Sequence, residues 1–155
     1  MHYLSRDEIM TTYKTTTVWK GGHLGRIVCS NGTQMDFSAP ADLYGQPNVL
    51  TPEDAFVGAL NMCFQLMFIW SVEKLKIDLI SYECEGEGFV EELLDRTSTF
   101  KKIVLRINIE VCNCSEKRVK RALKLAEKYS LIAQSINAEV MIESKIRFVG
   151  EEIYG

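Results

Sequence analysis

The alternation of apolar and polar residues predicts strands in the first third of this 155-residue chain. Residues 13–20, YKTTTVWK, are rich in the β-branched and aromatic residues that favour strands. Residues 25–38, GRIVCSNGTQMDFS, predict two strands joined at Asn31-Gly32, because this pair accepts the positive φ angles of a type I′ turn. Residues 39–50 contain two prolines and a glycine and predict a loop.

A long helix is predicted from about residue 52 to about residue 76. Thr51 is a good N-cap, and Pro52 suits the first helical position. Asp54, three residues after Thr51, can pair with it much as in a capping box. Residues 55–70 are apolar nearly all round, which predicts burial on every side of the helix. Because one domain of this size cannot easily cover such a helix, we expect burial between layers or at a subunit interface.

Alternation returns in the second half of the chain. Residues 79–89 and 100–111 predict two adjacent antiparallel strands, each with one solvated face. The apolar faces consist of Ile80, Tyr82 and Cys84 in the first strand, and of Ile103, Leu105, Ile107, Ile109 and Val111 in the second. The intervening sequence FVEELLDRTST is ambiguous, and a helical turn there stays open.

The last third predicts two helices and a strand. Ser115 caps a helix over residues 116–129, residues 130–137 suit a short helix, and residues 138–149 suit a closing strand. The core side of the first of these helices contains Val119, Ala122, Leu123 and Ala126. The final residues, GEEIYG, predict a frayed tail.

The strands occur in groups, which predicts an α+β fold with antiparallel pairing rather than a doubly wound sheet. The chain length suits a single domain over residues 1–155. Within it, residues 1–50 form N-terminal strands and a loop, and residues 51–155 form the helix-strand-strand-helix-strand part.

Charge and composition restrict the possible partners. A net charge of −3 argues against nucleic acid, because proteins that neutralise many phosphates normally have a basic face. The apolar stretch over residues 55–70 contains Asn61 and Gln65 and is short for a bilayer span. The chain start shows no secretory signal pattern. We therefore expect a cytoplasmic protein that does not bind a membrane.

Cysteine is the most informative residue type for chemistry. The chain has 5 cysteines and 2 histidines, which predicts neither a disulfide framework nor a metal site. No glycine-rich nucleotide motif and no nucleophile elbow is present, so we expect no cofactor. Cys63, inside the apolar helix, has two possible interpretations: a small core residue or a reactive thiol.

The stretch TPEDAFVGALNMCFQ resembles the central-helix motif of the OsmC/Ohr family of thiol peroxidases. In that family a Pro-Glu pair opens a buried helix, and the peroxidatic cysteine follows ten residues after the Glu, as Cys63 follows Glu53. The likeness runs from about residue 13 to about residue 148 and includes GGHLGRIVCSNG and RALKLAEKYS. It implies an OsmC-like α+β fold, with antiparallel sheets wrapped around long central helices in an intertwined homodimer that has two interfacial active sites.

The resemblance also implies a reaction. The Cys63 thiolate would attack an organic hydroperoxide or hydrogen peroxide and become a sulfenic acid, which a second cysteine after the later helix would convert to a disulfide. A hairpin arginine, held by the glutamate, would keep the thiolate charged. This chain departs from that pattern: Ser130 occupies the place of the second cysteine, and His23 occupies that of the arginine, with Arg26 nearby at a different position.

Two functions follow as hypotheses. In the first, Cys63 reduces peroxides in a one-cysteine cycle that an external thiol or dithiol completes, with Glu53, His23, Arg26 and Ser130 as the other site residues. In the second, the cycle has decayed and the dimer binds a small molecule or is structural. Ten residues of straight helix span about 15 Å, so Glu53 and Cys63 share a site only if the helix bends or the glutamate comes from the other subunit.

Overall fold

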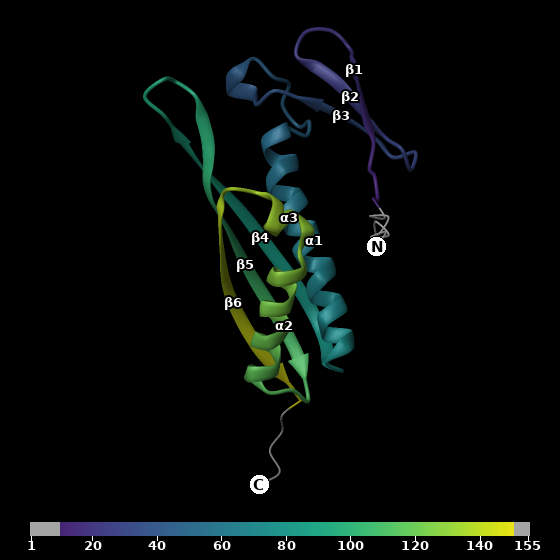
Figure 1. Cartoon of the computed structure of the whole chain (residues 1–155), viewed down its shortest axis with the longest axis vertical. Helices are drawn as coiled ribbons and strands as arrows, with labels where there is room; N and C mark the ends of the chain where they lie inside the picture. Colours follow the sequence, from purple (N-terminus) through teal and green to yellow (C-terminus); the bar gives the residue numbers. More distant parts are fainter. Residues whose placement is uncertain (1–9, 151–155) are drawn as a thin grey trace, which may run out of the picture. The chain divides into compact units, whose positions relative to one another are not determined.

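The structure is a computed structural model that describes residues 10–150, so the C-terminal tail from residue 151 lies outside the described residues. It divides into two compact units at residues 54 and 55, within the first turn of α1, and each unit is considered by itself. The elements, of which Figure 1 labels the strands and the α-helices, are β1 (Thr15–Trp19), β2 (Leu24–Cys29), β3 (Gln34–Ser38), η1 (Ala41–Leu43), α1 (Pro52–Lys74), β4 (Asp78–Glu92), β5 (Ser98–Cys112), α2 (Glu116–Tyr129), α3 (Leu131–Ser135) and β6 (Glu139–Val149). This order confirms the predicted succession of elements.

The N-terminal unit contains an antiparallel sheet in the order β1-β2-β3. The predicted hairpin is present, but its turn type was predicted wrongly, because Gly32 has a positive φ of 93° and Asn31 does not. The Gly32 N–H donates to the Cys29 carbonyl, and the Thr33 N–H donates to the Asn31 side chain. The loop is therefore one residue longer than a type I′ turn, and only its glycine needs the left-handed conformation.

The C-terminal unit contains a second three-stranded sheet in the order β4-β5-β6. The pairing of β4 with β5 is antiparallel, as predicted, but β6 runs parallel to β5, so the expectation of purely antiparallel pairing is wrong. The reason is the connection: α2 and α3 carry the chain back along the sheet before β6 begins, and such a crossover produces parallel strands.

Two details of β4 also differ from the prediction. The β4–β5 register shifts between Leu79 and Ser81, so Leu79 packs against the core and Ile80 is exposed. Such an irregularity reverses the alternation, which is why Ile80 was assigned to the wrong face. The ambiguous segment after β4 is a tight hairpin turn and not a helical turn, with Arg96 in the left-handed conformation.

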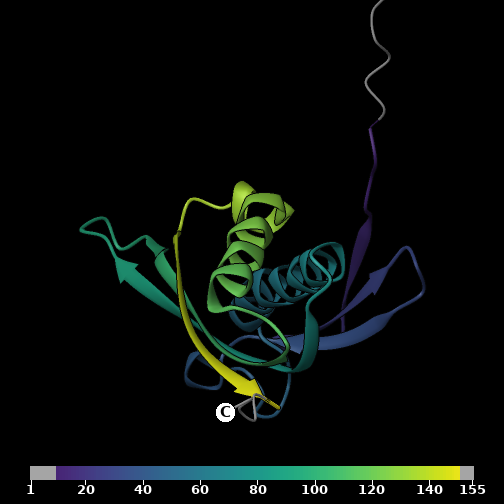
Figure 2. The same ribbon diagram turned by 90° about the horizontal axis from the view of Figure 1, so that it is seen from below.

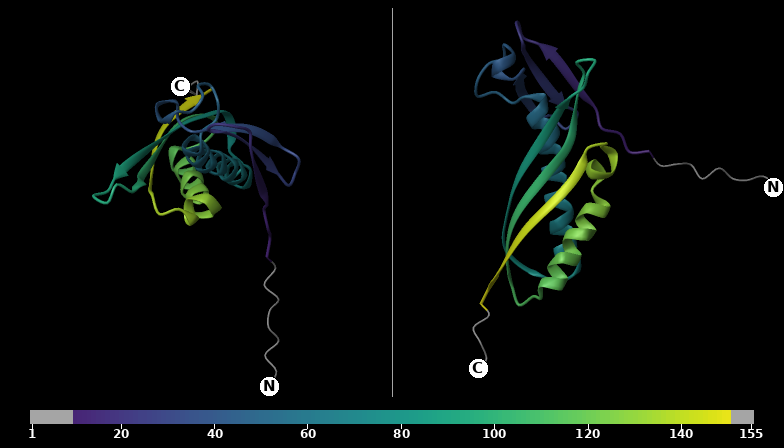
Figure 3. Two further views of the ribbon diagram at one scale, coloured as in Figure 1. Left: turned by 90° about the horizontal axis from the view of Figure 1, so that it is seen from above. Right: turned by 90° about the vertical axis from the view of Figure 1, so that its left-hand side faces the viewer.

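The core of the C-terminal unit lies between this sheet and the two longer helices. α1 and α2 both lie on the same face of the sheet, as Figures 2 and 3 show. The predicted inner face of β5 and the predicted core side of α2 are both confirmed. The buried side chains of this core include Leu60, Phe64, Phe68 and Val72 of α1, Ile103, Leu105, Ile107, Ile109 and Val111 of β5, and Val119, Ala122, Leu123 and Ala126 of α2.

Both helices begin as their sequences predict. The Thr51 hydroxyl accepts a hydrogen bond from the Asp54 N–H and donates one to the Asp54 carboxylate, a variant of the expected capping box. Ser115 caps α2 by accepting a hydrogen bond from the Arg118 N–H. α1 ends where Lys76 adopts a positive φ and its N–H donates to the Glu73 carbonyl, as in a Schellman motif.

Within one chain α1 is buried on one side only, so the predicted burial of its other side at a subunit interface stays a prediction. Its buried residues form one stripe, whereas Met62 and Leu66 are 64% and 62% exposed. One sheet and one neighbouring helix can cover only part of the circumference of a helix. Within residues 10–150, α1 is also the one helix long and apolar enough to cross a membrane, a property that the core helices of many water-soluble proteins share.

Two glycines of β4 allow α1 to lie close to the sheet. A Cβ atom at Gly88 would lie 2.6 Å from the Phe100 ring and 2.8 Å from the Val57 side chain. At Gly86 the nearest atoms, from Asn61 and Val57, would be 3.3 Å away. The glycines of ECEGEGF therefore leave the space that the first turns of α1 occupy.

We expect Gly88→Ala to lower the free energy of unfolding by about 1–3 kcal/mol, because the added methyl group meets the Phe100 ring and the Val57 side chain, which are both partly buried and must shift. Gly86→Ala is the graded comparison and should cost less, since its contacts are longer. Urea unfolding of the two variants measures the difference. A Gly88→Ala variant as stable as the unmodified protein would contradict this account of the helix–sheet packing.

Candidate functional site

Cys63 lies in the middle of α1, and its side chain is half-buried. Helical spacing places Ala59, Leu66 and Trp70 on the same side of α1 as the thiol. Leu66 and Trp70 are exposed, and the Trp70 ring meets that of Tyr129 edge to face. The thiol is therefore neither sealed in the core nor fully in water, and its surroundings are apolar.

One polar group reaches the sulfur. The fully buried Ser130 donates a hydrogen bond from its Oγ to Cys63 Sγ at 3.2 Å. The same Oγ accepts a hydrogen bond from the Ala133 N–H at 3.2 Å, which engages one lone pair of the oxygen and leaves its O–H free to donate to the sulfur. This contact joins the end of α2 to the thiol of α1.

The position of Ser130 follows from the way α2 ends. Its backbone N–H donates to the Ala126 carbonyl, which closes the last turn of α2. Ser130 then has extended backbone angles and is the N-cap of α3. Serine is well suited to interrupting one helix and beginning another, because its hydroxyl can satisfy an exposed backbone donor. This junction holds the hydroxyl at a fixed place beside α1.

Glu53 does not reach Cys63 in the same chain. It is exposed in the first turn of α1, and α1 continues as one unbroken helix to Lys74. Ten residues of such a helix separate the two side chains by about 15 Å along its axis. The bend that would join them within one chain is absent from α1, so a shared site needs the glutamate of another subunit.

His23 and Arg26 belong to the N-terminal unit. His23 is exposed in the turn before β2, and its ring stacks on Tyr44 with centroids 6.4 Å apart. Arg26 on β2 donates to the Asp36 carboxylate at 2.9 Å. That hydrogen bond raises the pKa of Arg26 and lowers the pKa of Asp36, so both side chains stay charged. The positive charge of Arg26 is thus compensated by a cross-strand partner.

Sequence reasoning missed three polar groups. Asp36 was not identified as the partner of Arg26, although β-hairpin register could have suggested it. The Asn61 amide donates to the Cys84 carbonyl, which ties α1 to β4 at 3.1 Å. The buried Tyr82 hydroxyl has no hydrogen-bond partner among the described residues, and burial raises its pKa. The sequence pattern placed Asn61 in the apolar helix and Tyr82 on the apolar face of its strand, but it did not indicate the hydrogen bonding of either side chain.

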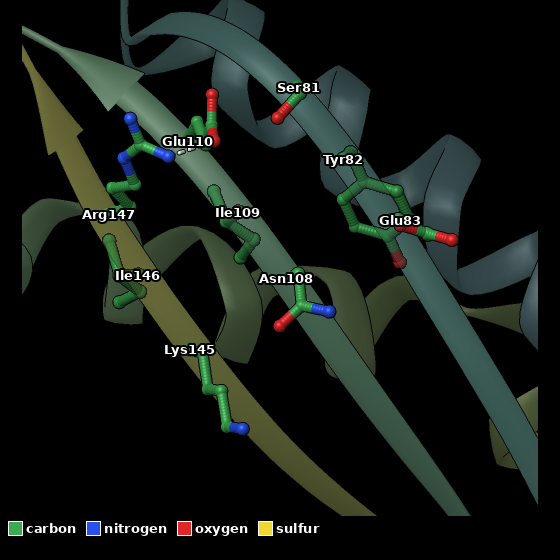
Figure 4. Close-up of a pocket in the computed structure, with 9 residues that line it drawn as sticks. All are labelled: Ser81, Tyr82, Glu83, Asn108, Ile109, Glu110, Lys145, Ile146 and Arg147. Carbon is green, nitrogen blue, oxygen red and sulfur yellow. Dashed lines mark hydrogen bonds and ion pairs between the residues drawn. The ribbon is translucent and has the colours of Figure 1, made fainter.

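The face of the second sheet that points away from the helices also has a cleft. Figure 4 shows its lining, in which the Arg147 guanidinium donates to the Glu110 carboxylate. The lining contains none of the five residues predicted for the site and comes from β4, β5 and β6: Ser81, Tyr82, Glu83, Asn108, Ile109, Glu110, Lys145, Ile146 and Arg147. Its alternating opposite charges suit a solvated, ion-paired sheet surface.

Comparison with known protein families identifies the family of this chain. Residues 45–145 match the family described as OsmC-like protein. The chain belongs to the OsmC-like family. The match covers α1 with Cys63 and α2 with the following Ser130, which are the elements that meet at the thiol. Comparison with curated proteins finds no match.

Solved structures of OsmC-like proteins have the same fold. An OsmC-like protein of unknown function from Vibrio cholerae is 21% identical and has a TM-score of 0.80, over 88% of this chain and 100% of that one. An organic hydroperoxide resistance protein from Elizabethkingia anophelis is 15% identical with a TM-score of 0.71, over 91% and 99%. That from Bacillus subtilis is 18% identical with a TM-score of 0.61, over 88% and 98%. Identities this low show the fold alone.

We expect Ser130→Ala to slow the alkylation of Cys63 by iodoacetamide about two- to tenfold at pH 7. That is the factor corresponding to one hydrogen bond of roughly 0.5–1.5 kcal/mol. Peptide mass spectrometry can follow Cys63 separately from the other thiols. Ser135→Ala is the matched control, because the Ser135 hydroxyl is exposed on α3 and donates only to the Leu131 carbonyl. Equal alkylation rates in the two variants would contradict a role for the Ser130 hydroxyl.

Proposed function

We propose that this OsmC-like protein reduces organic hydroperoxides or hydrogen peroxide through Cys63. The observation that carries the proposal is the contact between Cys63 Sγ and the buried hydroxyl of Ser130. A thiol that serves only as core filling needs no donor, and a buried hydroxyl usually bonds to backbone oxygen rather than to sulfur. Family membership and the fold shared with organic hydroperoxide resistance proteins point in the same direction.

The first step is attack of the Cys63 thiolate on the outer oxygen of the peroxide. The S–O bond forms as the O–O bond breaks, so sulfur is oxidised to a sulfenic acid and the peroxide leaves as an alcohol after taking up a proton. The Ser130 hydroxyl stabilises the thiolate before attack by donating to sulfur. The apolar side chains near Cys63, Leu66 and Trp70, can pack against the carbon part of an organic hydroperoxide.

The second step needs thiols from outside the chain. The side chain that meets Cys63 at the α2–α3 junction is a serine, which cannot form a disulfide. In this proposal Ser130 takes the place that a second, resolving cysteine has in the family pattern. Two external thiols, or one dithiol, reduce the sulfenic acid back to the thiol and release water and a disulfide.

The active unit in this proposal is a homodimer. The exposed apolar side of α1 contains Met62, Leu66 and Trp70, and a second copy of the chain would cover it. A partner subunit would also supply the Glu53 that the continuous helix keeps away from Cys63. In the same arrangement the hairpin residues His23 and Arg26 would complete each site, as the family's intertwined dimer implies.

One observation favours the alternative, a dimer that has lost its redox cycle and binds a small molecule. Arg26 is held by Asp36 at 2.9 Å, so its charge is not free to stabilise a thiolate. His23 is a weaker substitute for the arginine of the family pattern, because an imidazole lacks the fork of N–H donors that a guanidinium has. The reactivity of Cys63 separates the two functions.

Treatment of the reduced protein with one equivalent of cumene hydroperoxide should produce a sulfenic acid at Cys63. Trapping with a dimedone-type reagent and peptide mass spectrometry should locate the adduct, and Cys63→Ser should abolish it. The remaining four cysteines serve as internal controls. A Cys63 that stays reduced after long exposure would contradict the peroxidase and favour the binding function.

Ser130→Cys should convert the one-cysteine cycle into a two-cysteine cycle. With the two side chains already at contact distance, the new thiol can condense with the Cys63 sulfenic acid and expel water. Non-reducing peptide mapping after peroxide treatment should show a disulfide between positions 63 and 130. Ser135→Cys, on the exposed side of α3, should form none. A disulfide missing from Ser130→Cys would contradict the predicted proximity.

The Met62→Glu/Leu66→Glu variant should weaken the dimer, because it introduces two charges into the proposed apolar interface. Sedimentation equilibrium should show at least a tenfold increase in the dimer dissociation constant. Leu94→Glu is the control, since Leu94 is a fully exposed apolar residue at the tip of the β4–β5 hairpin. A protein that is monomeric before mutation would refute this part of the proposal.

A further inference from the structure

The charges of this protein are distributed unevenly, and α2 has most of the imbalance. Its sequence EKRVKRALKLAEKY contains six basic and two acidic residues, so the helix has a net charge of +4. The whole chain has a net charge of −3, which leaves −7 for all the other residues. A positive helix on an acidic protein creates a strong local field.

Three of the basic side chains are available to a partner. Lys117, Arg121 and Lys124 are exposed, have a spacing of i, i+4 and i+7 on one side of α2, and have no ion-pair partner among residues 10–150. With Glu116 and Lys120 they line a shallow depression. Arg118 differs from them, because it donates to the carbonyl oxygens of Leu75 and Lys76.

This arrangement is not the one that helix stability would favour. Like charges at i, i+4 destabilise a helix by about 0.2–0.5 kcal/mol per pair, and α2 contains such pairs at Lys117/Arg121 and Lys120/Lys124. The opposite side of α2 is already anchored by its buried apolar residues. A mixture of acidic and basic residues would therefore stabilise the exposed side of α2 better than the basic residues that it has.

The basic side of α2 also leads to the proposed site. α2 ends at Tyr129, and the next residue is Ser130, whose hydroxyl contacts Cys63. Along a helix axis, Lys124 lies about 9 Å and Lys117 about 20 Å from residue 130. A protein docked on this surface therefore lies within about 20 Å, along the helix axis, of the residue that contacts Cys63.

We propose that the exposed basic side of α2, formed by Lys117, Arg121 and Lys124, docks an acidic protein that supplies the reducing dithiol. This inference rests on the proposed function, because a one-cysteine cycle requires an external reductant. One thiol of the partner displaces water from the Cys63 sulfenic acid and forms a mixed disulfide. The second thiol then attacks that disulfide, releases the Cys63 thiol and leaves the partner oxidised.

An acidic protein suits this surface better than a nucleic acid or an anionic membrane does. The other parts of the chain have a net charge of −7 and would repel nucleic acid over most of the molecule. A membrane-binding helix would expose apolar residues beside the basic ones, whereas Val119, Ala122, Leu123 and Ala126 are buried. Charge attraction between compact proteins mainly accelerates encounter, which suits a reductant that must turn over.

The test uses two synthetic dithiol peptides of equal length as probes. Both contain a Cys-Gly-Pro-Cys centre, one flanked by glutamates and the other by lysines. Stopped-flow measurements follow the reduction of Cys63 sulfenic acid by each peptide and by dithiothreitol at low salt. Fluorescence anisotropy measures the binding of redox-inert versions, in which serines replace the cysteines, to the reduced protein.

The acidic peptide should reduce Cys63 at least tenfold faster than the basic peptide at low salt, and the difference should vanish in 0.5 M salt, where the Debye length is only about 4 Å. Arg121→Glu/Lys124→Glu should slow the acidic peptide at least fivefold, accelerate the basic peptide and leave dithiothreitol unchanged. Lys101→Glu/Lys145→Glu is the control, with the same change in charge on exposed residues outside α2.

The binding measurement separates this inference from the proposed function. In one outcome, Arg121→Glu/Lys124→Glu abolishes binding of the inert acidic peptide, but peroxide does not oxidise Cys63. That result would overturn the reductant role and the peroxidase, and it would leave the docking surface standing. A reactive Cys63 with equal rates for both peptides, or with equal losses in the control variant, would overturn the docking surface alone. Tighter binding of a 20-nucleotide RNA than of the acidic peptide would overturn the choice of partner.

Discussion

The structure of this protein depends on how α1 is covered. A helix that is apolar nearly all round must remove most of its circumference from water, and the β4-β5-β6 sheet together with α2 covers one stripe of it. Gly86 and Gly88 let the helix approach the sheet closely, and the Asn61 amide fixes its position on β4. The uncovered side is what makes a second copy of the chain part of the proposed active unit.

The same packing decides the chemistry available to Cys63. The thiol lies on α1 beside the junction of α2 and α3, where the chain stops one helix and starts another at Ser130. The capping role fixes the position of the Ser130 oxygen, and this oxygen in turn contacts the sulfur. One serine thus connects helix capping with Cys63, and in the proposed cycle its inability to form a disulfide leaves the reducing step to another molecule.

Charge adds a second level of organisation. The outer face of the second sheet has its acidic and basic residues paired across strands, for instance Arg106 with Glu85, Glu87 and Glu143. α2 keeps its basic residues largely without such partners. Pairing on the sheet contributes to strand register, whereas the unpaired charges of α2 create a field that acts on other molecules. The two surfaces therefore suit different roles.

Local signals in the sequence determined most of the elements. Helix caps at Thr51 and Ser115, the alternation in β5 and the apolar side of α2 depend on neighbouring residues, so the sequence alone predicts them. The family followed from the spacing of Glu53 and Cys63 within the helix motif, and the comparison confirmed it.

Only the tertiary structure decided the rest, because these features depend on residues far apart in the chain. The parallel pairing of β6 arises from the path of the crossover, and the exposure of Ile80 arises from a register shift against β5. The contact of Ser130 with Cys63 joins residues 67 positions apart, and local sequence patterns do not predict a contact over that separation. The sequence by itself determined which segments form helices and strands, and it singled out Cys63 as the candidate for chemistry. The tertiary structure decided which side chains meet, because contact energies between distant segments are realised only when packing brings those segments together.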